Sequence, residues 1–387
     1  MRKKIKNILR KVKLSYYNSG VVTKGQYRSL IEEIDSDESE VGPVIPKKFS
    51  NRDVPIIEIN NTCNIDCLMC KTSLSSRKKG KMPDEIFLEV LKQMKGMGIR
   101  SVELHTIGDP LANPNLPFIL SSLRKFNIST ALTTNGLLLK RHRDTLISHS
   151  DVIKGITFSI DGGTQATYEK IRFGGKWTDL MEAVAIARKS IRPVINTRTM
   201  TVVSKDNLHE IGKIITSFRD LVTDISRDMD FGLLNSLSPD GSYFQAMNLF
   251  PSQTHKNNRC KYVSGSSLYI LVDGRISVCC RDYDGSLVVS SLGEHTFEDV
   301  ANSNLLRKLQ RAHNEGDVSD YRLCDTCFIV SGRIKSLFPK FMKYFLRCHP
   351  TVTADIYQNF AEELVSSLGM TNIVEQRLKL KKILSQI

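Results

Sequence analysis

Three cysteines stand close together early in the chain, in the segment Cys63-Asn-Ile-Asp-Cys67-Leu-Met-Cys70. Cysteine spacing of this density is typical of an iron–sulfur cluster or a zinc site. Structural zinc is normally closed by four ligands, which commonly come as two pairs. A group of three leaves one metal position open, so the spacing favours an iron–sulfur cluster that also binds a small ligand.

A second group of cysteines lies about two hundred residues farther along. Its members are Cys260, Cys279, Cys280, Cys324 and Cys327. The last two form a CxxC pair, which is common to zinc and iron–sulfur sites. Many turn residues surround this group, so we expect a small module organised around metal ligands.

The chain has 387 residues, of which 41% are hydrophobic and 25% are charged. These values are those of an ordinary soluble globular protein with two or three modules. No apolar run reaches the roughly 18–20 residues that a membrane-spanning helix needs. The basic start also lacks the apolar stretch of a signal peptide. We therefore expect a cytoplasmic, reducing environment, in which the cysteines are ligands or catalysts before they are disulfides.

The net charge of +14 is concentrated at the two ends of the chain. Residues 1–13 carry +7, residues 333–387 carry +5, and the middle carries only +2. This distribution argues against a nucleic-acid groove across the body. It permits peripheral contact with an anionic membrane surface, through the first residues and through the aromatic and basic segment 333–347. Apolar residues at helical spacing in residues 1–13 fit a short interfacial helix or a solvated tail.

Alternating strand and helix patterns begin near residue 54. Strands are predicted at residues 55–59, 101–107, 129–133, 155–160, 194–203 and 223–231. Helical patterns lie between them, near 84–97, 114–126, 138–149, 177–190 and 207–219. This rhythm predicts an α/β fold with a parallel sheet, which roughly six repeats would form as a partial (β/α)6 barrel of the TIM type. No strand is followed by a GxGxxG segment, so a dinucleotide-binding fold is not expected.

Composition divides the chain into four predicted parts. Residues 1–52 form a basic arm and linker, and residues 53–235 form the partial barrel. Residues 236–332 form the cysteine-rich module, and residues 333–387 form a basic helical segment.

The first cysteine group resembles the CxxxCxxC signature of radical S-adenosylmethionine (SAM) enzymes, and further motifs follow in the order of that family. The segment ending Gly108-Asp109-Pro-Leu is similar to the family's Gly-Glu-Pro-Leu, with Asp in place of the usual Glu. Thr133-Thr-Asn135-Gly resembles its third strand end, and Ser159-Ile-Asp161 resembles its fourth. Tyr168 to Arg172 resembles its Tyr-x-x-x-Arg segment. All of them follow strand ends, where barrel active sites are built.

This resemblance implies a set of cofactors and the residues that bind them. Cys63, Cys67 and Cys70 would hold a [4Fe-4S] cluster whose fourth iron binds SAM. One electron would then cleave SAM to methionine and a 5′-deoxyadenosyl radical, which takes hydrogen from the substrate. The residues implied in SAM binding are Met69, Gly108, Asp109, Asn135, Ser159, Asp161 and Arg172.

The second cysteine group resembles the twitch or SPASM module that follows the barrel in many members of that family. The resemblance implies that one auxiliary [4Fe-4S] cluster is ligated by Cys260, Cys279, Cys324 and Cys327. The next cysteine is Cys348, twenty-one positions beyond Cys327, which favours a single auxiliary cluster. Zinc is the alternative for this quartet, because four cysteines would also close a tetrahedral site.

The expected function is that of a radical SAM oxidoreductase, either a dehydrogenase or an epimerase. Its expected substrate is a sugar, a cyclitol or a lipid-linked glycan, and a flavodoxin or ferredoxin would supply electrons. Asp282 is the candidate base for an oxidation and Cys280 the candidate hydrogen-atom donor for an epimerisation. The plain alternatives are a surface turn residue for Asp282 and a small packed residue for Cys280. Two other functions remain open, a peptide-modifying enzyme and a zinc-stapled binding protein that is not an enzyme.

Overall fold

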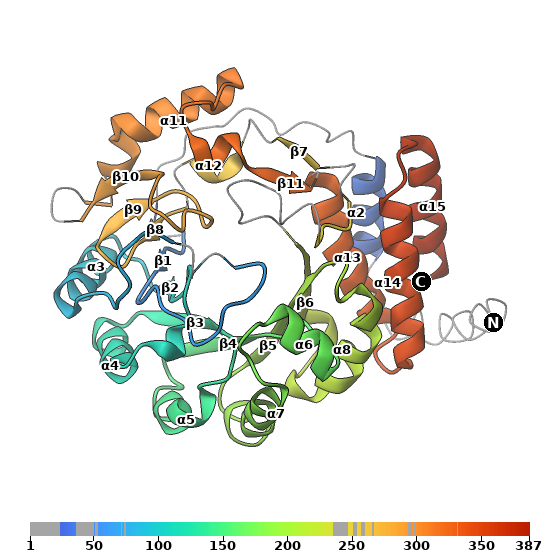
Figure 1. Ribbon diagram of the computed structural model, residues 1–387, viewed down its shortest axis with the longest axis horizontal. Helices are drawn as coiled ribbons and strands as arrows, with labels where there is room; N and C mark the ends of the chain where they lie inside the picture. The colour runs from blue at the N-terminus through green and yellow to red at the C-terminus, as the bar shows by residue number, and fades with distance from the viewer. Residues whose placement is uncertain are drawn as a thin grey trace.

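The computed structural model describes residues 24–35, 50, 53–70, 72, 75–234, 247–250, 254–256, 260–264, 267–292, 296–297, 299–330 and 332–387. Figure 1 shows a curved sheet with helices along its outer side, and a bundle of helices at one end. The interfacial helix expected within residues 1–13 lies outside the described residues and stays a prediction.

Six parallel strands form the barrel part of the sheet, in the order of the chain. They are β1 (Ile56–Ile57), β2 (Ser101–Glu103), β3 (Ser129–Thr134), β4 (Ile153–Ser159), β5 (Thr197–Val203) and β6 (Met229–Leu233). Alternate residues of β5 are buried, as expected for a strand packed on one face. The predicted partial barrel is therefore confirmed.

Helices connect these strands and cover the outer face of the sheet (Figure 1). They are α3 (Asp84–Gly96), α4 (Leu116–Phe126), α5 (Leu139–Ser148), α6 (Gln165–Ile171), α7 (Trp177–Ile186), α8 (Ile211–Phe218) and α9 (Ile225–Asp228). The strand expected at 223–231 was placed too early. Asp224 accepts a hydrogen bond from the Ser226 N–H and caps α9, so the strand begins only at Met229.

The cysteine-rich module extends the same sheet rather than standing apart from it. Its strands β8 (Tyr269–Ile270), β9 (Arg275–Ser277) and β10 (Val288–Ser291) give a nine-stranded sheet of order β10-β9-β8-β1-β2-β3-β4-β5-β6. β8 pairs parallel with β1, and Ile56 lies opposite Tyr269. The other elements of the module are the paired strands β7 (Thr254–Lys256) and β11 (Phe328–Val330) and the helices α11 (Asn304–Glu315) and α12 (Arg322–Asp325).

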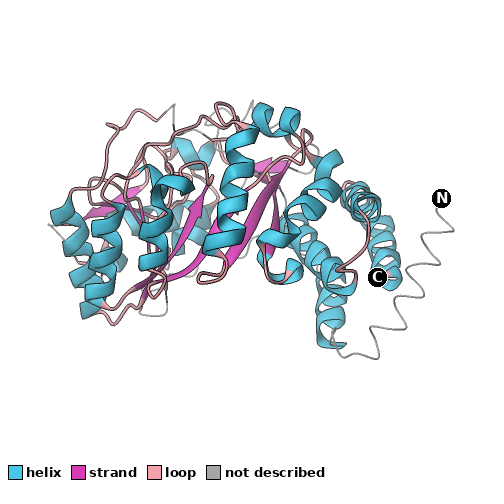
Figure 2. Ribbon diagram, turned by 90° about the horizontal axis from the view of Figure 1, so that it is seen from below, coloured by secondary structure: helices cyan, strands magenta, loops and turns pink. Residues whose placement is uncertain are grey.

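A helical bundle packs beside β6 and α8 (Figures 1 and 2). It comprises α13 (Gly332–Cys348), α14 (Ala354–Leu368), α15 (Ile373–Gln386) and α2 (Lys24–Asp35). The helical C-terminal segment is thus confirmed. The inclusion of α2 was not expected, since residues 1–52 were predicted to be an arm and linker.

The aromatic side chains of α13 belong to the core of the molecule. Phe338 and Phe341 are fully buried, and Phe345 stacks on Phe360 with 3.8 Å between the ring centroids. The expectation that the aromatic part of segment 333–347 contacts a membrane is therefore wrong, because these rings pack inside the bundle. Among the residues that the structure describes, no helix is long and apolar enough to cross a membrane.

Candidate functional site

The first cysteine group lies in the loop between β1 and α3, at the carboxyl end of the first barrel strand. Two backbone hydrogen bonds hold this loop against the end of α6. The Asp66 N–H donates to the Phe173 carbonyl over 2.8 Å, and the Leu68 N–H donates to the Ile171 carbonyl over 2.9 Å. A segment about one hundred residues away therefore fixes the shape of the cysteine loop.

Each of the three thiols meets a polar group. The Asn135 amide donates to Cys63 Sγ over 3.5 Å, and the Arg172 guanidinium donates to Cys67 Sγ over 3.4 Å. Cys70 Sγ lies 3.0 Å from the Thr72 hydroxyl. N–H donors directed at sulfur stabilise thiolates, which are the form that ligates iron.

Burial opposes ionisation of these thiols in the absence of metal. It raises the pKa of Cys63 to about 12. It also raises the pKa of Cys67, although the charge of Arg172 works in the other direction. A bound cation would reverse this balance, because it stabilises the thiolate directly. An all-sulfur donor set with N–H groups directed at two of the sulfurs fits an iron–sulfur cluster.

Arg172 and Asp161 form a buried ion pair next to Cys67. The Arg172 Nε donates to Asp161 Oδ2 over 2.6 Å, and the Asp161 side chain is 0% exposed. The Val202 N–H holds the other oxygen of Asp161 over 2.7 Å. Burial alone would lower the pKa of Arg172, but Asp161 and Cys67 outweigh it and raise that pKa. Asp161 thus positions a permanent positive charge against the cysteine loop.

Gly108 and Asp109 follow β2 and underlie the same loop. Gly108 has φ +84°, and a Cβ there would lie 2.7 Å from the carbonyl oxygens of Asn60 and Thr62. The Asp109 carboxylate accepts from the Thr134 hydroxyl and from the N–H groups of Asn135 and Leu111, all within 2.9 Å. Both of its oxygens are therefore committed to joining the ends of β2 and β3.

Of the predicted SAM-binding residues, Asn135 and Arg172 donate hydrogen bonds to cysteines of this loop, and Asp161 pairs with Arg172. Their role in binding SAM stays a prediction. Asn135 and Asp161 are buried, whereas Ser159, at the end of β4, is only half-buried. Met69 is half-buried and packs on the core. Sequence reasoning missed Thr72, whose place two residues after Cys70 was the only signal available.

The second cysteine group is drawn together from three segments. Cys279 follows β9, Cys324 lies in α12, and Cys327 precedes β11, while Cys260 precedes a short 3-10 helix. Burial, together with the neighbouring Cys260 and Cys327, raises the pKa of Cys324 to about 12. The four thiols that the resemblance assigned to an auxiliary cluster are thus electrostatic neighbours.

Arg281 supplies hydrogen bonds to two of these thiols. Its guanidinium donates to Cys327 Sγ over 3.3 Å, and its backbone N–H donates to Cys279 Sγ over 3.4 Å. This residue was not predicted, although its place two positions after Cys279 suits an N–H···S contact.

The two candidate catalytic residues have different environments. Cys280 is exposed. Asp282 is 4% exposed and accepts four hydrogen bonds, from the Ser277 hydroxyl, both donors of Ser286 and the Leu287 N–H. Asp282 therefore closes the turn between β9 and β10, but it is buried there, whereas the plain alternative was a surface turn residue.

Within the described residues, no three His, Cys, Asp or Glu side chains are placed to hold a single metal ion. The nine cysteines form no disulfide.

Comparison with known proteins agrees with this geometry. Residues 57–218 match the model of the radical SAM superfamily, and residues 260–328 match that of an iron–sulfur cluster-binding domain, SPASM. The chain belongs to the radical SAM superfamily. This radical SAM protein therefore has a SAM-binding [4Fe-4S] cluster and an auxiliary iron–sulfur cluster as its implied cofactors.

Two curated relatives show how widely this family varies. The chain is 26% identical to the probable GTP 3',8-cyclase of Archaeoglobus fulgidus over 42% of its own length and 54% of that protein. It is 21% identical to the S-adenosyl-L-methionine-dependent 2-deoxy-scyllo-inosamine dehydrogenase of Niallia circulans, over 71% of its length and 92% of that protein. The chain thus spans about half of the cyclase but nearly all of the dehydrogenase.

One solved structure shares the fold across both domains. The anSMEcpe protein with bound AdoMet and the Cp18Cys peptide superposes with a TM-score of 0.54. The match covers 80% of this chain and 98% of that chain, at 15% identity. At this identity the likeness concerns the fold alone.

Proposed function

We propose that this radical SAM enzyme oxidises an alcohol carbon of a sugar, a cyclitol or a lipid-linked glycan. The observation that carries this proposal is the extent of the match with the 2-deoxy-scyllo-inosamine dehydrogenase. It covers 92% of that protein, whereas the match with the cyclase covers 54%. A flavodoxin or ferredoxin is the proposed electron donor.

The chain's own residues would prepare the first cluster site. Cys63, Cys67 and Cys70 would hold the cluster, which with bound SAM supplies a 5′-deoxyadenosyl radical. Asn135 and Arg172 would stabilise the ligating thiolates through their N–H groups. Asp161 fixes the orientation of Arg172.

The second thiol group supports oxidation over epimerisation. Oxidation of an alcohol removes a hydrogen atom from carbon, a proton from oxygen and one further electron. Cys260, Cys279, Cys324 and Cys327 would hold an auxiliary cluster able to accept that electron. Epimerisation needs no such acceptor, because the hydrogen atom taken from one face of the carbon is replaced on the other.

The roles of Asp282 and Cys280 separate the two reactions. For oxidation, Asp282 would have to give up a hydrogen bond from Ser277 or Ser286 before it could accept the substrate proton. For epimerisation, the exposed thiol of Cys280 would donate a hydrogen atom. In deuterated water, epimerisation through Cys280 would place one deuterium on carbon, whereas oxidation gives an unlabelled carbonyl product.

The decisive experiment uses anaerobically reconstituted enzyme with SAM, a reductant, and sugar and cyclitol candidates. Transfer of substrate deuterium into 5′-deoxyadenosine, together with a carbonyl product, supports the proposal. Transfer from a peptide instead would establish the peptide-modifying alternative. Zinc without iron or sulfide in the purified protein would leave only the binding-protein alternative.

Cysteine variants test whether the first cysteine group holds the SAM-binding cluster and the second holds the auxiliary cluster. Replacing Cys63, Cys67 and Cys70 by Ala should abolish SAM cleavage. Replacing Cys324 and Cys327 by Ala should remove about four irons per chain, one [4Fe-4S] cluster, and leave uncoupled SAM cleavage. Unchanged iron in the second variant would contradict the auxiliary-cluster assignment.

A further inference from the structure

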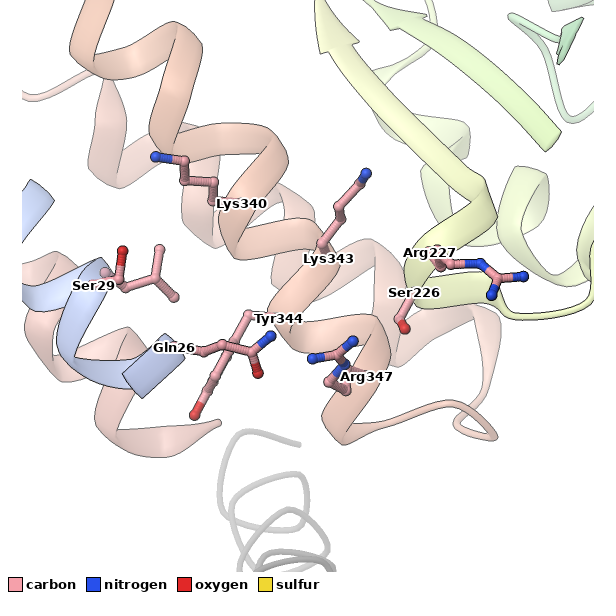
Figure 3. A pocket seen from close by; sticks show the side chains of 9 residues that line it. Gln26, Ser29, Ser226, Arg227, Lys340, Lys343, Tyr344 and Arg347 are labelled. Atoms are coloured by element: carbon pink, nitrogen blue, oxygen red, sulfur yellow. The ribbon is translucent and has the colours of Figure 1, made fainter. Parts of the chain in front are cut away.

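A basic pocket lies where the helical bundle meets the barrel. Its volume is about 330 Å³, which falls in the range of small-molecule sites. Three elements far apart in sequence, α2, α9 and α13, contribute its walls (Figure 3). The lining residues are Gln26, Ser29, Leu30, Ser226, Arg227, Lys340, Lys343, Tyr344 and Arg347.

Of the nine described residues that line the pocket, four are cations and none is an acid. Three of the cations, Lys340, Lys343 and Arg347, come from one face of α13, spaced three and four residues apart. Like charges at this spacing repel and destabilise a helix. The sequence of α13 contains no Asp or Glu that could relieve the repulsion within the helix.

Acids from neighbouring elements neutralise three of the four cations. Lys343 pairs with Asp230 over 2.5 Å, and Arg227 pairs with Asp228 over 3.0 Å. Lys340 forms an ion pair with Glu33. For Arg347, the described part of the chain provides no such ion pair. The pocket therefore keeps an excess positive charge at Arg347.

The other lining groups suit an oxyanion as well. Gln26 and Arg347 extend toward one another from α2 and α13 in Figure 3. Gln26, Ser29 and Tyr344 add neutral groups that can donate hydrogen bonds. Arginine presents several N–H groups in a plane, which matches the oxygens of a phosphate group.

The pocket is separate from the cluster sites. Ser226 and Arg227 lie just before β6, at the amino end of that strand. The cysteine loop and its surrounding motifs follow the carboxyl ends of the strands. Because the six strands are parallel, these two ends lie at opposite edges of the sheet.

We propose that this pocket binds the phosphate group of an anionic ligand, with Arg347 as its principal contact. The phosphate can belong to a soluble phosphate compound or to a phospholipid headgroup. Either source presents the same oxygens to Arg347, so the experiment must distinguish them. The proposal does not depend on the reaction proposed above.

Calorimetric titration of the full-length protein at low salt tests the soluble source, with inorganic phosphate and glycerol 3-phosphate as probes. Flotation with vesicles of phosphatidylglycerol or of phosphatidylcholine alone tests the lipid source. In Arg347→Gln, we expect the affinity for the binding probe to fall about tenfold or more, because a charge-assisted hydrogen bond is lost. Arg311→Gln, the same change on an exposed arginine of α11, should bind as the original protein does.

Two further measurements keep the test decisive. Thermal unfolding without ligand checks that Arg347→Gln is folded, and Lys340→Gln repeats the binding test on a second cation of the lining. SAM cleavage should be unchanged in both variants. Binding of soluble phosphate alone identifies a phosphorylated small molecule, and binding of anionic vesicles alone identifies a phospholipid. If no probe binds, or if Arg347→Gln and Arg311→Gln bind equally, the pocket is not a phosphate site.

Discussion

At the scale of single residues, each of the two cysteine groups accepts a hydrogen bond from an arginine side chain. Arg172 donates to Cys67, and Arg281 donates to Cys327. Hydrogen bonds to cluster sulfurs are one of the means by which proteins set reduction potentials. Each arginine is therefore placed to influence the reduction potential at its own cluster site.

Replacing Arg281 tests this influence at the auxiliary site. In Arg281→Met, the auxiliary cluster should become harder to reduce, because a positive charge and an N–H···S bond are lost. The potential should fall by up to roughly 100 mV, since 59 mV corresponds to a tenfold change for one electron. A redox titration followed by electron paramagnetic resonance measures the shift. Arg275→Met is the control in the same domain, because Arg275 pairs with Asp273. An unchanged potential in Arg281→Met would remove the tuning role.

Gly108 matters because its lack of a side chain lets the backbone pass close to neighbouring carbonyl groups. Gly108→Ala would force a Cβ to within 2.7 Å of the Asn60 and Thr62 carbonyls, at a positive φ that itself costs about 1–2 kcal/mol. We expect the cysteine loop to be displaced and the iron content to fall by the amount of one cluster. Iron and sulfide analysis measures this loss. Gly80→Ala is the matched control, because a Cβ there meets no atom within 4 Å. Equal iron in the two variants would contradict the prediction.

At the scale of elements, the docking of α14 on α8 joins the helical bundle to the barrel. The Gly212 N–H donates to the Gln358 side chain over 3.1 Å, and Gln358 donates to the Leu208 carbonyl over 2.7 Å. A Cβ at Gly212 would lie 2.0 Å from the Ala354 carbonyl oxygen. The two elements approach this closely only because position 212 has no side chain.

Gly212→Ala should therefore destabilise the whole protein by about 1–3 kcal/mol, the usual cost of overpacking a close contact. Thermal unfolding measures the effect. The control is Gly96→Ala in α3, where a Cβ meets no atom within 4 Å and alanine favours the helix. A melting temperature of Gly212→Ala at or above that of the control would show that α14 is not held as closely as described.

At the scale of the whole molecule, one buried ion pair links the two cluster-bearing domains. Arg77 donates to both oxygens of Glu58 over 2.6 and 2.7 Å, and to the Tyr283 carbonyl over 2.8 Å. Glu58 also accepts from the Thr106 hydroxyl and the Val272 N–H. Together with the β1–β8 pairing, this group makes the barrel and the SPASM module one continuous structure.

Arg77→Met should reduce the free energy of unfolding by about 3–5 kcal/mol, because Glu58 would remain as a buried charge without its partner. The double variant Glu58→Gln with Arg77→Met should lose less, since the uncompensated charge is gone. Denaturant unfolding should follow a single transition for both domains in the original protein. Two separate transitions there would mean that the continuous sheet does not couple them.

The sequence alone determined the chemistry and the barrel of this protein. The Cys63–Cys70 group lies within eight residues, so its ligand pattern is visible without any knowledge of the fold. The strands and helices of the barrel follow from local hydrophobic periodicity, which each segment carries by itself. The family motifs can be recognised in the sequence for the same reason, since each is a short segment that follows one strand.

Only the tertiary structure decided which side chains are engaged in hydrogen bonds and how segments far apart in the sequence pack together. The oxygens of Asp109, for example, accept hydrogen bonds from Thr134 and Asn135, which lie about 25 residues away in the sequence. The pairing of β8 with β1 joins segments about two hundred residues apart, and the pocket at Arg347 needs α2 and α13 together. Local patterns cannot specify such contacts, because each depends on a partner that only folding brings near.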